Sequence, residues 1–179
     1  MLDAGVSKAF AVADHQIAHI YINDPSVTEK VKALLKGVKG IELILDKGEQ
    51  QKYHIDHERS GDMVVVADAN SWFTYYFWLD DVLAPDYARC VDIHKKPGYD
   101  PVEMFMTSKG RAAYKLLRKL AGFRYVMDVI PLDATLIKGS HGRTNIPAEY
   151  KAVLITDELQ KDVLPTDVFD IIWKKLKGE

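Results

Sequence analysis

The sequence predicts an α/β fold. Short β-branched runs of strand length alternate with segments of helical period, and one continuous apolar run, from Asp62 to Asp68, lies between carboxylates. A continuous apolar run is typical of a strand covered on both faces, as in a mixed or parallel sheet. We therefore expect a central mixed sheet flanked by helices, in a single domain over residues 1–179.

Other runs in the sequence also have the length and composition of strands. They are rich in β-branched or alternating apolar residues, the composition that strands favour. They cover residues 9–13, 18–22, 41–45 and 152–155. A turn of sequence Asp-Lys-Gly, from Asp46 to Gly48, is expected directly after the third of these runs.

Three segments are predicted to be helices, because apolar residues recur on one face of each. Capping residues precede the first and the third. The first follows Asp24-Pro25 and ends at Gly37 and Gly40. The second runs from about Ser108 to Ala121. The third follows Thr166-Asp167 and carries lysines near its C-terminal end, where they suit the helix dipole.

The segment from Ser71 to Tyr99 has no sustained period, and we expect it to form a long packed loop. It opens with a cluster of aromatic residues from Trp72 to Trp78. Such a cluster could stack a nucleobase or bind a sugar. Because further apolar residues follow closely, packing of the loop against the sheet is the favoured interpretation.

Composition excludes several classes of protein. The chain has 24 Lys plus Arg and 26 Asp plus Glu, a formal charge of −2, which argues against a polybasic nucleic-acid binder. Its one cysteine, Cys90, allows no internal disulfide and no Cys-rich zinc module. No apolar run approaches the roughly 20 residues of a membrane span, and the first residues lack the pattern of a secretory signal. Neither nucleic acid nor membrane is therefore an expected partner. The sequence does not identify the cell compartment, and the cytoplasm is favoured.

The six histidines are the first candidates for chemistry. His15 and His19 share one face of a strand or helix, but the pair lacks the further neighbours that a ligand set needs. His54 and His57 lie in a polar segment that favours a solvated turn. From spacing alone, most of the histidines are interpreted as bystanders.

Two loops combine charged groups with turn residues. Residues 92–100 gather a carboxylate, an imidazole, two ammonium groups and a phenol, which suit phosphate oxygens or a metal, although composition alone favours a hydrated surface loop. Gly139 and Gly142 flank His141, so the backbone can turn tightly and bring the imidazole close to a cation. Arg143 could offer a planar fork to a phosphate. A flexible loop tip is the alternative for this second loop.

Several segments together, in order and at plausible spacing, resemble the C-terminal portion of bacterial type I phosphodiesterase/nucleotide pyrophosphatase-like proteins of the alkaline phosphatase superfamily. The resemblance covers nearly the whole chain. It is carried by Asp14 to Ile22, Arg59 to Asp62, Trp72 to Tyr76 with Trp78 to Asp81, Ala84 to Asp86, Asp92 to Pro101, Asp128 to Asp133 and Gly139 to Arg143.

The resemblance implies a metal-dependent hydrolase with an alkaline-phosphatase-like sheet, in which two divalent ions, typically zinc, flank a Thr or Ser nucleophile. A late His-Gly pair of the family matches His141-Gly142, so His141 is the expected metal ligand, and His94 is a second candidate. Arg143, Tyr99 and Lys95 are the expected contacts to a phosphodiester or nucleotide substrate. At most a partial zinc site is therefore expected in this chain.

The sequence also departs from the family. Asp14-His15-Gln16 has Gln where the Gly of an Asp-His-Gly pair would be sought, and the nucleophile with the early metal ligands would precede Met1. No catalytic residue is therefore assigned in this chain. We expect a C-terminal segment that supplies one metal ligand and part of the substrate site and is inactive alone.

A function of another class stays open. The chain could be a non-catalytic domain that binds a ligand or a partner protein, with the aromatic loop as its contact surface. A piece of a larger sheet also exposes an edge or an apolar face that must be covered, so we expect self-association as a homo-oligomer.

Overall fold

A computed structural model describes residues 3–90, 101–156 and 163–178. Contacts divide the chain into two units, residues 1–144 and 145–179, which are described separately below. The single domain expected from the sequence stays a prediction. Within the described residues, no helix has both the length and the apolar character needed to span a membrane.

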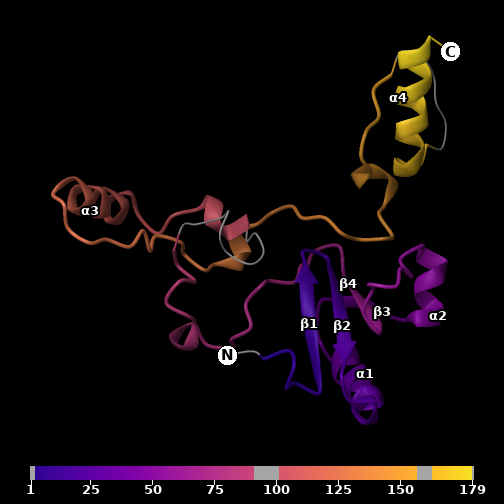
Figure 1. Cartoon of the computed structure of the whole chain (residues 1–179), viewed down its shortest axis with the longest axis horizontal. Helices are drawn as coiled ribbons and strands as arrows, with labels where there is room; N and C mark the ends of the chain where they lie inside the picture. The colour runs from indigo at the N-terminus through magenta and orange to yellow at the C-terminus, as the bar shows by residue number, and fades with distance from the viewer. Residues whose placement is uncertain (1–2, 91–100, 157–162, 179) are drawn as a thin grey trace. The chain divides into compact units, whose positions relative to one another are not determined.

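The first unit is built on a four-stranded sheet of order β1-β2-β4-β3 (Figure 1). Its strands are β1 (Ala9–Asp14), β2 (Ile17–Ile22), β3 (Ile41–Asp46) and β4 (Met63–Ala67). The predicted α/β class and these four strands are confirmed. The predicted mixed sheet is wrong for the described strands, because all three pairings are antiparallel. The two-residue connection between β1 and β2 is too short for any other arrangement.

β4 is the central strand of the fold, and all five of its residues are buried. Met63 and Val65 belong to a hydrophobic cluster on one face of the sheet, and Val64 and Val66 to a cluster on the other. Residues of helix α1 (Thr28–Lys36) pack against the first cluster, and Tyr53 and Ile55 pack against the second. The strand is therefore covered on both faces, as its continuous apolar run predicted.

Asp46 begins a short helix, α2 (Lys47–Gln50), where the sequence was interpreted as a simple turn. Its carboxylate accepts hydrogen bonds from the backbone N–H groups of Gly48 and Glu49, at 3.1 and 3.0 Å. The Glu49 carboxylate accepts in return from the Asp46 N–H, at 3.0 Å. This reciprocal capping box satisfies the N–H groups at the start of the helix, so the predicted turn is wrong.

The described part of the predicted loop, from Ser71 to Cys90, forms no strand, as predicted, and its aromatic residues are part of a core. Trp72, Tyr76 and Trp78 pack against a buried cluster of Ala88, Val102, Ile130 and Leu132, and Phe73 packs against the sheet. Packing of the aromatic cluster is thus confirmed, although most of it is against this second core and not the sheet. Cys90 is half-buried.

Helix α3 (Lys109–Leu120) closely matches its prediction. The Ser108 hydroxyl accepts a hydrogen bond from the Arg111 N–H at 3.1 Å and so caps the first turn. Arg111 and Lys115 both contact the Asp128 carboxylate, at 2.6 and 2.7 Å, and thereby hold the helix against the following segment. The hydrogen bond from Lys115 is the main reason that the pKa of Asp128 is lowered.

The second unit contains α4 (Val168–Lys177), which confirms the predicted C-terminal helix and its lysine-rich last turn. Asp167 was expected to cap this helix, but its carboxylate makes no capping hydrogen bond to it. The carboxylate instead accepts a hydrogen bond from the Leu164 N–H at 2.8 Å, across a 3-10 turn. The strand predicted at residues 152–155 is wrong, because these residues are exposed and pair with no strand in the described part of the chain. An apolar run becomes a strand only when a partner accepts its backbone hydrogen bonds.

We expect His19 to make the stability of the fold depend on pH. Its Nδ1 accepts a hydrogen bond from the Gly61 N–H at 3.0 Å, and burial lowers its pKa below the usual value. As pH falls below about 6.5, the unfolded chain takes up a proton that folded His19 resists, so the free energy of unfolding decreases. Thermal unfolding measured from pH 7.5 to 5 should show this loss.

His19→Gln tests the assignment, because Gln keeps an acceptor for Gly61 but does not titrate. The variant should flatten the pH profile, and the exposed control His54→Asn should keep the wild-type slope. Equal slopes for wild type and His19→Gln would contradict the prediction.

Candidate metal centre

The candidate centre begins at the connection between β1 and β2. Asp14 is the last residue of β1, and His15 follows with φ of +57°, in the left-handed region. Histidine tolerates this region better than most residues that carry a side chain. The Phe73 N–H donates to the His15 carbonyl at 2.6 Å, so the aromatic segment is fixed to the same turn.

A distant segment, residues 138–143, lies against this turn. The Gln16 N–H donates a hydrogen bond to the His141 carbonyl at 2.8 Å. Gly142 has φ of +109°, and a Cβ atom there would lie 3.2 Å from both the Asp14 carbonyl oxygen and a methyl carbon of Ile17. Glycine therefore permits both the backbone conformation and the close approach to the turn.

Arg143 anchors the same segment to the sheet. Its Nη1 lies 2.6 Å from the Glu42 carboxylate on β3 and donates to the carbonyl of Ala67, the last residue of β4, also at 2.6 Å. Its side chain is only 9% exposed, so this ion pair is largely shielded from solvent. The guanidinium thus has a structural role, and its predicted contact to a substrate phosphate stays a prediction.

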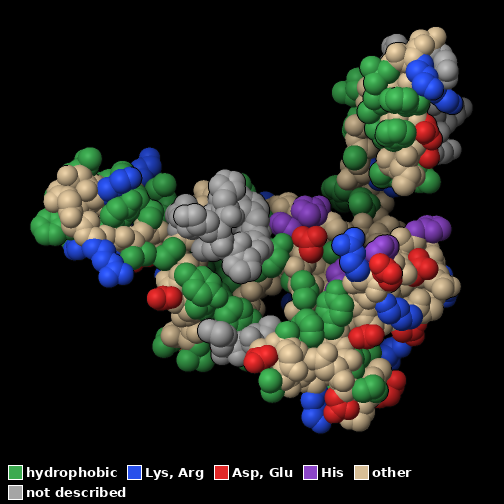
Figure 2. Space-filling model, in the orientation of Figure 1, with side chains coloured by type: hydrophobic (Ala, Val, Ile, Leu, Met, Phe, Trp, Pro, Cys, Tyr) green, Lys and Arg blue, Asp and Glu red, His purple; other side chains and the backbone are tan. Residues whose placement is uncertain are grey.

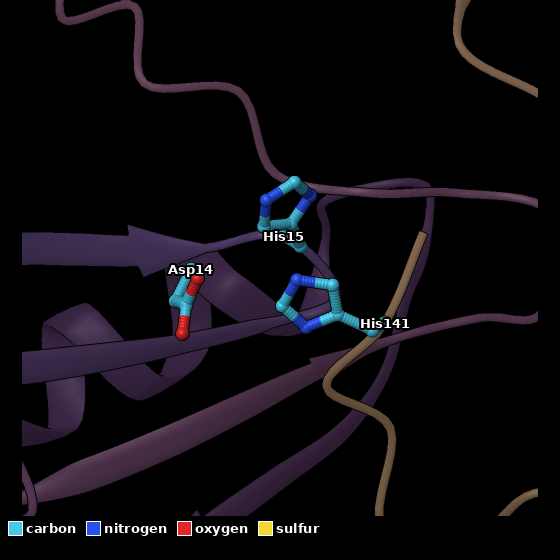
Figure 3. Close-up of side chains that lie close together, drawn as sticks. All are labelled: Asp14, His15 and His141. Carbon is cyan, nitrogen blue, oxygen red and sulfur yellow. The ribbon is translucent and has the colours of Figure 1, made fainter. Parts of the chain in front are cut away.

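These anchors bring Asp14, His15 and His141 together (Figure 3). One ligand atom from each of the three residues lies within 4.8 Å of the other two, and the two imidazole centroids are 4.2 Å apart. Asp14 and His141 are exposed, and His15 is half-buried. Histidine and acidic side chains accordingly meet at the surface near the end of β1 (Figure 2).

Neighbouring groups fix the orientation of His15 and Asp14. Nδ1 of His15 lies 3.0 Å from the Ser140 hydroxyl, and its ring lies 6.0 Å from the rings of Trp72 and Tyr75. The Tyr75 hydroxyl donates to the Asp14 carboxylate at 3.3 Å. Second partners of this kind are typical of metal-binding histidines and carboxylates, because they set the tautomer and the ring orientation.

The chemistry of this donor set fits a zinc ion. Two imidazoles and one carboxylate are a ligand set of catalytic zinc sites, which keep a fourth position for water or substrate. Ligand atoms about 2.1 Å from one zinc ion lie roughly 3.4 Å apart. The exposed side chains of Asp14 and His141 can close the remaining distance by rotation.

Only some of the predicted site residues lie in the part of the chain that the structure describes. His141 lies in the cluster, whereas His94, Lys95 and Tyr99 fall outside the described residues, so their roles stay predictions. Among the remaining histidines, His57 accepts a hydrogen bond from the Arg59 N–H, and His54 is exposed, as expected of a solvated turn.

Sequence reasoning missed Asp14 and His15 as candidate ligands. The adjacent Asp-His pair was a signal, since it stands where an Asp-His-Gly pair would be sought, but Gln16 in place of Gly argued against it. In the structure the Gln16 backbone N–H bonds to the segment that carries His141. A glycine is therefore not needed at this position to bring the two segments together.

No protein-family model matches the chain, and no curated protein matches it. Among solved structures, a phosphonoacetate hydrolase from Sinorhizobium meliloti 1021 aligns with a TM-score of 0.34 and 22% sequence identity. The alignment covers 38% of this chain and 20% of that chain. The chain thus has a weak structural similarity to one part of that hydrolase, and a similarity of this extent assigns neither fold nor activity.

We expect Gly142→Ala to disturb the centre. The strained φ and the contacts to the Asp14 and Ile17 region should lower the free energy of unfolding by about 1–3 kcal/mol and displace His141. Denaturant unfolding and zinc titration measure the two effects.

Gly139→Ala is the matched control in the same segment. At this position φ is not in the left-handed region, and an added Cβ would have no neighbouring atom within 4 Å. A Gly142→Ala protein as stable as Gly139→Ala, with unchanged zinc affinity, would contradict the importance of this close approach.

Proposed function

We propose that this chain is the C-terminal part of a metal-dependent phosphodiesterase/nucleotide pyrophosphatase-like hydrolase of the alkaline phosphatase superfamily. The observation that carries the proposal is the convergence of Asp14, His15 and His141, whose ligand atoms lie within 4.8 Å of one another. The sequence resemblance, which pointed to His141 independently of its neighbours, supports it further.

In this proposal the three side chains hold one zinc ion. His15 binds through Nε2, because its Nδ1 contacts the Ser140 hydroxyl, and Asp14 supplies negative charge that offsets the charge of the cation. A zinc ion there would act as a Lewis acid toward a phosphoryl oxygen. The nucleophile and the ligands of a second ion would come from polypeptide outside this chain, as the resemblance implies.

Zinc titration tests the metal site. The purified chain, stripped with a chelator, should bind one zinc ion per chain in calorimetry. His141→Ala and His15→Ala should each weaken binding by about 10–100-fold or more, since each removes a ligand. His54→Asn, an exposed histidine outside the cluster, is the control and should bind like wild type.

Binding that is equally strong in wild type and in both cluster variants would place the zinc elsewhere and remove the basis of the proposal. Cobalt substitution adds an independent readout, because its visible spectrum reports the ligand set. The His141→Ala spectrum should then differ from the wild-type spectrum.

The chain should not turn over substrate by itself. Phosphoryl transfer in two-metal sites uses ions about 3.5–4 Å apart and an oriented nucleophile, and no such nucleophile is assigned here. A nitrophenyl phosphodiester with added zinc should therefore be hydrolysed no faster than in the zinc buffer alone. Turnover that survives purification and disappears in His141→Ala would show that the chain is a complete catalyst.

A specific observation also favours the second candidate, an interaction domain. In α3, Leu116, Leu117 and Leu120 are 49%, 63% and 80% exposed, while Arg111 and Lys115 are held by Asp128. Figure 2 shows hydrophobic side chains at the surface of this helix. Exposed apolar side chains in such a group are typical of contact surfaces, and a second copy of the chain is the proposed partner. Absent zinc binding, combined with concentration-dependent dimerisation in light scattering, would favour this role over the hydrolase.

A further inference from the structure

A cavity of about 620 Å³ lies directly beside the proposed zinc site. Ser140, whose hydroxyl contacts Nδ1 of His15, is part of its wall, and so is Gln16, the residue after His15. Trp72, whose ring lies 6.0 Å from the His15 ring, also lines it. A molecule in this cavity would therefore lie against the residues that orient the zinc ligand His15.

The charged residues that line the cavity are both lysines. Lys39 and Lys138 line it, and the lining contains no Asp or Glu, although acidic residues outnumber basic ones in the chain. The Lys138 ammonium donates to the Thr135 carbonyl at 2.7 Å, which holds it at the wall. Two ammonium groups without a carboxylate among the lining residues favour an anion.

The remaining wall is polar and fixed, with one aromatic side. The Gln16 amide donates to the Ser71 and Asp68 carbonyls, at 3.0 and 3.4 Å, so this part of the lining does not depend on a ligand for its position. Trp72 packs against the second hydrophobic core, which holds its indole beside the cavity. An indole face can stack a planar ring.

The size agrees with a small-molecule ligand. Ligand sites in proteins usually measure about 300–1,000 Å³ and combine a few charged or polar groups with aromatic surface. This cavity lies within that range and combines two lysines, neutral hydrogen-bonding side chains and one indole. A planar ring that carries a negative group satisfies both the lysines and the indole.

We propose that this cavity binds the non-transferred part of the phosphoric ester, and that this part is a planar ring bearing its own anionic group, a phosphate or a carboxylate. Lys39 and Lys138 neutralise the anion, and Trp72 stacks the ring. That the bound molecule is part of a substrate rests on the proposed function. The binding itself needs no metal, so it can be tested separately.

The test uses the full chain in excess chelator, with binding followed by NMR chemical-shift titration. The first probe is AMP, with adenosine as its ring alone and inorganic phosphate as its anion alone. The second is benzoate, with benzyl alcohol as its ring alone and acetate as its anion alone. AMP or benzoate should bind at least about tenfold more tightly than the matching ring or anion alone, because charge-assisted contacts and stacking add. AMP binding without benzoate binding identifies the anion as a phosphate, and the reverse identifies a carboxylate.

The lysine assignment has a matched control. Lys39→Ala/Lys138→Ala should weaken the tighter probe at least about tenfold, whereas Lys30→Ala/Lys52→Ala, which removes the same charge from exposed positions outside the lining, should not. Binding that is equal for the two double variants, no tighter for both AMP and benzoate than for their rings alone, or absent for all probes would overturn the proposal.

The two proposals fail in different ways. His141→Ala should weaken zinc binding as predicted above and leave probe binding in chelator unchanged. Probe binding without zinc binding by the wild type would overturn the hydrolase and keep the anion cavity, whereas zinc binding without probe binding would overturn the cavity and keep the metal site.

Discussion

The candidate centre depends on the attachment of residues 138–143 to the turn between β1 and β2. Two anchors make this attachment: the hydrogen bond from the Gln16 N–H to the His141 carbonyl, and the contacts of the Arg143 guanidinium with Ala67 and Glu42. Ordering an irregular segment costs backbone entropy, about 1–2 kcal/mol per residue, and these contacts offset part of that cost. Without them, His141 would be the flexible loop tip that the glycine-rich sequence allows.

Two backbone positions make the attachment possible. His15 and Gly142 both have positive φ, and they lie in the two segments that meet. At His15 the left-handed conformation closes the short connection between antiparallel strands and places a candidate ligand next to Asp14. At Gly142 the absence of Cβ lets the second segment reach the Asp14 carbonyl. Unusual backbone conformations at a cluster of potential ligands are typical of functional sites.

Local sequence patterns predicted the parts of the fold that depend on near neighbours. The strands around β4 and the three longer helices were recognised from period and capping residues, since these signals are short-range. Asp46 was misinterpreted because a turn and a capping box can both start with Asp. Only the hydrogen bond from the Asp46 N–H back to the Glu49 carboxylate distinguishes the two. Residues 152–155 were misinterpreted because a strand also needs a partner, which its own sequence cannot show.

The site was predictable only in part, for the same physical reason. His141 was found through a resemblance, and its glycine neighbours explain its approach to the turn. Asp14 and His15 become ligand candidates only because residues 138–143, far along the chain, bring His141 next to them. The spacing of residues in the sequence does not predict this contact. Arg143 was assigned to a phosphate from its chemistry, whereas its nearest acceptors, Glu42 and Ala67, lie on strands whose positions the sequence did not specify.

The end of β4 gives this irregular site a rigid support. Ala67 donates its N–H to the Gln16 carbonyl at 2.9 Å and accepts from Arg143 through its own carbonyl, so the turn and the distant segment are both bonded to one residue of the central strand. Because both faces of β4 are buried, this residue cannot move without disturbing both clusters of the sheet. Ligands on loops are usually less precisely held than ligands on strands or helices. Here a loop histidine gains that precision through hydrogen bonds to a buried strand, which is what a metal site with one ligand from a distant segment requires.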